Sequence, residues 1–140
     1  MFVIPVRVLF QHTILVVEDD QQSREGLRGW LVSHGYAVDT ALDVVEALRR
    51  IKTSRHDMAI IDIHLPDRVL LGLDGWDLAR IFRAYNPTGA VIVVSAEEVM
   101  VAKDIRAEVD GFLRKPIELV QLQTMLDTLR SGPATLPPTL

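Results

Sequence analysis

The sequence predicts an α/β fold, a doubly wound sheet of five parallel strands with helices on both faces. Five short apolar segments alternate with amphipathic segments of helical length, and the connections between them are short. The apolar segments are nearly continuous rather than alternating, which is typical of strands buried on both faces. At 140 residues the chain has the length of a single domain.

The first strand is predicted at residues 13–18, where the run TILVVE ends on an acid. A helix follows, because Asp20 is a good N-cap and Gly35 is a good stop signal. Between them lies an apolar stripe at helical spacing, formed by Leu27, Trp30 and Leu31.

The second strand is predicted at residues 36–40, YAVDT. Asp43 then has the spacing of a capping box with Glu46, which predicts the start of the next helix. One face of that helix is apolar, with Val44, Ala47, Leu48 and Ile51. The third strand, residues 58–62, again runs from apolar residues to an acid.

A loop extends to about Asp74, and a helix with an apolar stripe ends before Asn86. The stripe consists of Leu78, Ile81, Phe82 and Tyr85. Residues 90–95 form the fourth strand, and residues 97–107 are expected to be helical. After a fifth strand at residues 111–115, a last amphipathic helix carries Leu119, Leu122, Met125, Leu126 and Leu129.

Composition excludes several functional classes. The chain has no cysteine, so a disulfide framework, thiol catalysis and a zinc site with sulfur ligands are ruled out. Its net charge is −4, and no block of basic residues predicts direct binding to nucleic acid. The acidic excess is instead suited to a cation.

The two ends differ from the rest. Residues 1–12 are apolar but contain Pro5 and Arg7, so we interpret them as an arm or an extra strand, or as an artefact of the start site. They lack the basic leader of a signal peptide and the length of a membrane span, and we expect a cytoplasmic protein. Residues 131–140 are rich in Pro, Ser and Thr and are expected to form a flexible tail.

Polar residues stand where the predicted strands end. Glu18 and Asp19 follow the first strand and Asp62 ends the third, so these carboxylates converge if the two strands are neighbours. Such a cluster would be strained by repulsion, and Mg²⁺, which prefers oxygen ligands, would relieve the strain. An acid before a helix can also act as a cap, which is our interpretation of Asp20. Ser95 and Lys115 end the fourth and fifth strands.

Four segments in this order, ILVVEDD, AIIDIHLP, VIVVSA and GFLRKP, closely resemble the receiver domain of two-component response regulators. The resemblance covers about residues 13–130. It implies a flavodoxin-like strand order, 2-1-3-4-5, and a Mg²⁺ cofactor.

The resemblance also implies roles for individual residues. Asp62 matches the aspartate that accepts the phosphoryl group, and Asp19 matches the main metal-binding acid, with Glu18 beside it. The backbone carbonyl of His64 matches a further metal ligand. Ser95 matches the hydroxyl that turns towards the phosphoryl group, and Lys115 matches the lysine that pairs with it.

Three more features follow from the resemblance. Phe112 matches the switch aromatic, although it could also be an ordinary core residue. The bond between Lys115 and Pro116 is expected to be cis. His64 and Glu97 occupy the two positions that modulate the lifetime of the phosphoryl group in relatives, and we hypothesise that they interact over the mouth of the site.

The sequence departs from the family pattern in three places. The stretch from Pro66 to Gly75 contains an insertion that brings Val69, Leu70 and Leu71 beside the predicted site. The segment from Ser95 to Lys115 is shorter than usual. Ser also stands at position 95 where Thr is commoner in the family.

The predicted function is a signalling phosphoacceptor fed by a histidine kinase or a histidine phosphotransfer protein, not an enzyme in the usual sense. The output partner is unknown, and a homodimer through the terminal helices or the N-terminal arm remains open. One alternative is a phosphorylation-silent scaffold. Another is a magnesium-dependent aspartyl-phosphate hydrolase, although His64 stands where such enzymes need a second acid. A dinucleotide site is disfavoured because no G-x-G-x-x-G follows the first strand.

Overall fold

The computed structural model describes residues 12–66, 71–96 and 109–130. Several predictions lie outside these residues and stay predictions. They concern the N-terminal arm, Val69 and Leu70 of the insertion, the helix at residues 97–107 with Glu97, and the C-terminal tail.

The described strands form one parallel sheet in the order β2-β1-β3-β4-β5, as predicted. Their bounds are β1 Thr13–Val17, β2 Ala37–Ala41, β3 Met58–Asp62, β4 Ala90–Ser95 and β5 Gly111–Arg114. The central β3 is buried at every position, which explains its continuous apolar run.

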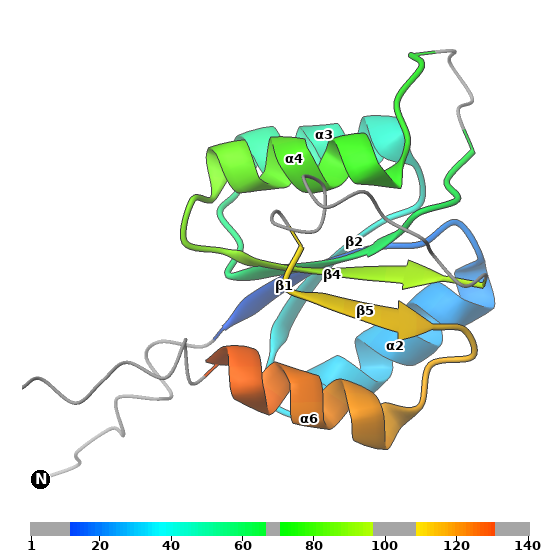
Figure 1. Ribbon diagram of the computed structural model, residues 1–140, viewed down its shortest axis with the longest axis vertical. Coiled ribbons are helices and arrows are strands. Elements are labelled where there is room, and N and C mark those ends of the chain that lie inside the picture. Colours follow the sequence, from blue (N-terminus) through cyan, green and yellow to red (C-terminus); the bar gives the residue numbers. More distant parts are fainter. Residues whose placement is uncertain (1–11, 67–70, 97–108, 131–140) are drawn as a thin grey trace, which may run out of the picture.

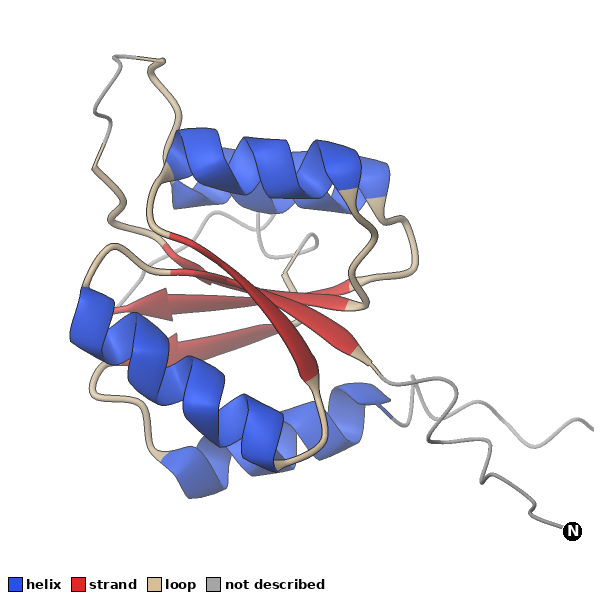
Figure 2. Cartoon of the chain, turned by 180° about the vertical axis from the view of Figure 1, so that it is seen from behind, coloured by secondary structure: helices blue, strands red, loops and turns tan. Residues whose placement is uncertain are grey.

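Helices cover both faces of the sheet, which confirms the predicted fold class (Figures 1 and 2). Their bounds are α2 Gln21–Ser33, α3 Val44–Thr53, α4 Gly75–Tyr85 and α6 Leu119–Arg130. The pair α3 and α4 covers one face, and the pair α2 and α6 covers the other. None of the helices within the described ranges is long and apolar enough to cross a membrane.

Each face of the sheet has its own apolar core, because successive side chains of a strand point to opposite faces. Leu15 and Val17 of β1 pack with the residues under α3 and α4, whereas Ile14 and Val16 pack with those under α2 and α6. Burial on both faces fixes the strand register, since a slip of one residue would exchange the two cores.

The helix starts follow the predicted capping chemistry with one correction. Asp20 caps α2 by accepting a hydrogen bond from the Ser23 backbone N–H, as predicted. Asp43 accepts a hydrogen bond from the Glu46 backbone N–H, but the structure records only this half of the predicted capping box. The complete, reciprocal box forms at the start of α4, between Asp74 and Asp77.

Two residues expected on apolar faces are exposed. Tyr85 is 48% exposed because it is the last residue of α4 and borders a shallow hollow beside residues 51–55. Leu119 is 45% exposed because it is the first residue of α6 and lies at the edge of a cavity.

The start of α4 is fitted tightly against the end of β3. The Gly75 backbone N–H donates to the carbonyl of Ile63 at 3.2 Å. A Cβ at Gly75 would meet the carbonyl of Asp62 and lie 2.6 Å from Cα of Ile63. Only glycine allows this approach, so Gly75 helps to position the backbone that carries Asp62.

Candidate functional site

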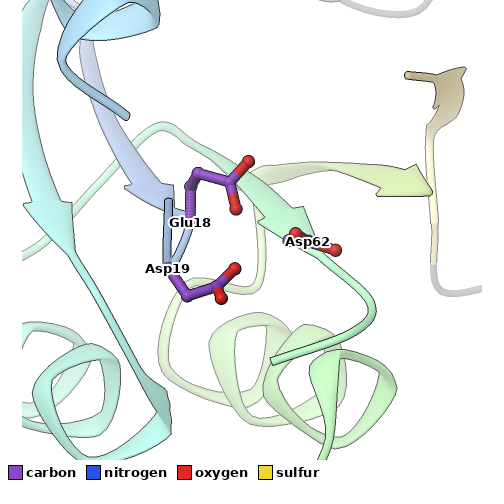
Figure 3. Close-up of side chains that lie close together, drawn as sticks. All are labelled: Glu18, Asp19 and Asp62. Carbon is purple, nitrogen blue, oxygen red and sulfur yellow. The ribbon is translucent and has the colours of Figure 1, made fainter. Parts of the chain in front are cut away.

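Three carboxylates gather beyond the carboxyl ends of β1 and β3 (Figure 3). They belong to Glu18, Asp19 and Asp62, and one oxygen from each lies within 4.8 Å of the others. The convergence predicted from the sequence is therefore present, because β1 and β3 are parallel neighbours whose ends lie at the same edge of the sheet.

Glu18 is the most constrained of the three acids. It is 6% exposed, and its Oε1 accepts a hydrogen bond from Lys115 Nζ at 2.6 Å. Its Oε2 is buried with no hydrogen-bond partner in the structure. Burial raises the pKa of Glu18 from 4.5 to about 7, opposed by the hydrogen bond from Lys115 and reinforced by the negative charge of Asp62.

Lys115 supplies the positive charge of the site. It follows β5 directly, its peptide bond to Pro116 is cis as expected, and its Nζ lies 2.7 Å from Asp62 Oδ2. Partial burial disfavours the charged ammonium, but hydrogen bonds to Asp62 and Glu18 outweigh it, so the pKa of Lys115 is raised. One ammonium serves two buried carboxylates, and negative charge therefore remains in excess.

Asp62 is held by both of its carboxylate oxygens. Oδ2 accepts from Lys115, and Oδ1 accepts from the backbone N–H of His64 at 2.9 Å. The residue is 5% exposed. These two bonds fix the direction of the carboxylate. The residue His64 is itself exposed, and its position two residues past Asp62 places its backbone, rather than its ring, in contact with the acid.

Arg24 is a residue of the site that sequence reasoning missed. Its Nη1 donates to the backbone carbonyl of Glu18 at 3.0 Å and to that of Asp19 at 3.3 Å. The guanidinium thus braces the turn that aims both acids at Asp62. No sequence signal marked this role, because an arginine in the first turns of a helix usually faces solvent.

Two further predicted residues flank the cluster. Ser95 is buried at the end of β4, and its carbonyl accepts a hydrogen bond from the Lys115 backbone N–H at 2.8 Å. Phe112 is 38% exposed on β5, with its ring centroid 6.1 Å from that of Trp76 on α4. Phe112 is therefore not an ordinary core residue in this conformation.

The predicted site residues are thus grouped in space. Glu18, Asp19, Asp62 and Lys115 form one cluster, and Ser95 ends the strand next to Asp62. Phe112 lies on the outer strand, and Glu97 is outside the described residues.

A family model, the response regulator receiver domain, matches residues 14–127. The chain belongs to the response regulator receiver family. Among curated relatives, this receiver domain is similar to the response regulators MprA of Mycobacterium sp. (strain KMS) and of Mycobacterium avium (strain 104). Each is 34% identical over 118 residues, which is 83% of this chain and 49% and 50% of the respective relative. The chain spans about half the length of these curated relatives.

Solved receiver structures have the same fold. A CheY-like receiver domain from Methylobacillus flagellatus is 27% identical, with a TM-score of 0.74 over 85% of this chain and 98% of that one. The response regulator TrrA of Thermotoga maritima, solved in complex with Mg²⁺ and BeF, is 27% identical, with a TM-score of 0.73 over 85% of this chain and 99% of that one. The chain is thus a receiver domain of the two-component signalling class.

Proposed function

We propose that this receiver domain takes a phosphoryl group from a phosphohistidine donor onto Asp62, with Mg²⁺, and thereby switches a partner-binding surface. The observation that carries the proposal is the contact between Lys115 Nζ and Asp62 Oδ2 at 2.7 Å, inside a cluster of carboxylates. The ammonium of Lys115 is a positive charge beside Asp62, whose position is fixed by β3 and by the hydrogen bond from the His64 backbone N–H.

The donor set fits a hard divalent cation. Three carboxylates lie within reach of one another, and the buried Oε2 of Glu18 lacks the partner that a buried oxygen needs. Glu18, Asp19 and Asp62 would hold Mg²⁺, with the backbone carbonyl of His64 as a fourth ligand. When bound, the ion supplies positive charge that neutralises the transferring phosphoryl group.

The chemical step needs few groups. A carboxylate oxygen of Asp62 forms a bond to phosphorus while the bond from phosphorus to the donor's imidazole nitrogen breaks, and the imidazole leaves. Lys115 is placed to pair with the phosphoryl oxygens, and we assign the Ser95 hydroxyl a hydrogen bond to the same group. The product is an aspartyl phosphate on Asp62.

The proposed response begins at two flanking residues. A Ser95 side chain that turns towards the phosphoryl group leaves space that the exposed ring of Phe112 can enter. Phe112 would then leave the Trp76 ring. The surface around β5 and α6 would change with it.

The lifetime of the phosphoryl group depends on access of water to Asp62. We assign this control to His64 and Glu97, which would meet over the mouth of the site. Replacing both by alanine should change the rate of dephosphorylation, and an unchanged rate would dismiss the assignment.

The proposal is tested by intact-mass measurement after incubation with Mg²⁺ and acetyl phosphate. We expect the mass to rise by one phosphoryl group and the adduct to be absent from an Asp62→Asn variant. Glu25→Gln is the matched control, because Glu25 is an exposed carboxylate on α2 outside the cluster.

Other outcomes would replace the proposal. Turnover of many phosphoesters without a stable adduct would indicate a hydrolase. If neither an adduct nor turnover is found with acetyl phosphate or with a histidine kinase as donor, the protein would be a scaffold that signals without phosphorylation.

A further inference from the structure

A cavity of about 650 Å³ lies between α2 and α6, on the face of the sheet opposite α3 and α4. Its floor is formed by the strands, and Glu18, Asp62 and Lys115 line one end of it. Its lining is mostly apolar and includes Val16, Leu27, Trp30, Ile60, Ile117 and Leu119. We call this cavity the α2–α6 groove.

The α2 wall of the groove is open at one position, a glycine that stands among larger side chains. Gly26 lines the groove, and a Cβ added there would have no heavy atom within 4 Å. Leu31 is the one residue of α2 that is fully buried, and Leu27 and Trp30 are partly buried against the core. An apolar hollow of this size beside a polar rim is typical of a binding site.

A segment of the chain itself has the composition to fill the groove. Residues 1–11 contain eight large apolar residues, no acid and a single charged residue, Arg7. They lead directly into β1, whose residues Val16 and Val17 line the groove. Because helices in this fold run antiparallel to the strands, the chain enters β1 at the same end of the domain as the carboxyl ends of α2 and α6 (Figure 2).

The segment is also long enough. Ten extended residues span at most about 33–36 Å. The helix α2, which forms one wall of the groove, has 13 residues and is therefore about 20 Å long. A segment that turns back at residue 12 is thus long enough to run alongside α2 and reach the end of the groove that Glu18, Asp62 and Lys115 line.

We propose that residues 1–11 fold back over their own domain and dock their apolar side chains in the α2–α6 groove. The docking removes two apolar surfaces from water at once, which is the driving force for the contact. Glu18, Asp62 and Lys115 line one end of the groove, where two carboxylates against one ammonium leave an excess of negative charge that would attract Arg7.

Trypsin gives a direct test, because Arg7 is the only site for this protease within residues 1–11. Mass spectrometry follows cleavage after Arg7 in the folded protein and in a synthetic peptide of residues 1–12. We expect the bond in the protein to be cleaved at least about tenfold more slowly than in the peptide, since proteolysis follows the population of the undocked state. The protection should be the same at low and high protein concentration.

Two glycines of α2 provide matched variants. Gly26→Leu fills the groove and should raise cleavage after Arg7 towards the rate of the peptide. Gly29→Leu is the control, because Gly29 is also open to a Cβ but does not line the groove, and its cleavage should match the wild type. A third variant, Val6→Asp, alters only the segment and should also release it without affecting the folded domain.

Three results would overturn the proposal. Cleavage at the rate of the free peptide would show that the segment does not dock. Equal protection in Gly26→Leu and Gly29→Leu would place it elsewhere on the domain. Protection that grows with protein concentration, together with a dimeric mass in light scattering, would assign the groove to a second copy of the chain.

Discussion

The ammonium group of Lys115 lies 2.6 Å from Oε1 of Glu18, although 97 residues separate them in the chain. The same nitrogen lies 2.7 Å from Asp62 Oδ2. One cation therefore contacts two buried carboxylates and reduces the repulsion between them. Lys115 is therefore a structural counter-charge of the site as well as the group proposed to pair with the phosphoryl oxygens.

Replacing Lys115 by alanine should lower the free energy of unfolding in EDTA by about 1–2 kcal/mol. This loss of stability is smaller than for a fully buried ion pair because the Lys115 side chain is 29% exposed. Mg²⁺ should recover part of the loss, since it supplies positive charge to the folded state alone. Chemical denaturation with and without Mg²⁺ measures both effects.

Lys52→Ala is the control for that experiment, because Lys52 is an exposed lysine at the end of α3. It should change the stability by less than about 0.5 kcal/mol. The Lys115 variant should also accept phosphoryl groups about 100-fold more slowly. Wild-type stability and phosphorylation rate in Lys115→Ala would contradict both roles of this residue.

The raised pKa of Glu18, about 7, predicts that the affinity for Mg²⁺ depends on pH. Binding requires the carboxylate, so the affinity should rise by up to about tenfold per pH unit below pH 7 and level off above it. Titration calorimetry at several pH values between about 6 and 8 measures this dependence. A Glu18→Gln variant should bind Mg²⁺ more weakly, with little change in affinity across the same range.

The raised pKa of Glu18 also predicts how the stability of the magnesium-free protein depends on pH. The folded-state pKa lies above the ordinary value of 4.5, so the unfolded chain releases this proton first as the pH rises. Stability should therefore fall between about pH 4.5 and pH 7 and then stay constant with respect to this group. The slope should be smaller in Glu18→Gln, and an identical slope would show that another group causes it.

Gly75→Ala should destabilise the domain by about 1–3 kcal/mol, because the added methyl group would press on the backbone of Asp62 and Ile63. Gly29→Ala is the matched control in another helix, where a Cβ meets nothing within 4 Å. It should stabilise the domain by up to about 1 kcal/mol through helix propensity. Thermal or chemical unfolding should therefore show stability changes of opposite sign for the two variants. A Gly75→Ala variant as stable as the wild type would argue against the close approach of α4 to the end of β3.

The ring contact between Phe112 and Trp76 predicts an optical signal for the proposed switch. The chain has two tryptophans, so a Trp30→Phe variant reports on Trp76 alone. Adding Mg²⁺ and beryllofluoride, a phosphoryl mimic, should change its emission as Phe112 moves inward. Ser95→Ala should weaken the change. An emission spectrum unaffected by the mimic in Trp30→Phe would contradict the movement of Phe112.

Much of the fold could be predicted from the sequence because the pattern is strong. The five strands are confirmed within one residue at each end, since nearly continuous apolar runs bounded by polar residues leave little choice. Capping was less predictable. The pair Asp43 and Glu46 had the capping spacing, yet the reciprocal box formed at Asp74 and Asp77, because the direction of the side chain at the third helical position decides it.

The sequence by itself determined the alternation of strands and helices and the positions of the acids and the lysine at strand ends, because these depend on hydrophobic pattern and local order along the chain. Only the tertiary structure decided that Lys115 binds Glu18 as well as Asp62, that Arg24 braces both acids, and that a hollow remains between α2 and α6. These features arise between segments far apart in the chain, where the packing of whole elements sets which side chains meet and which spaces stay open.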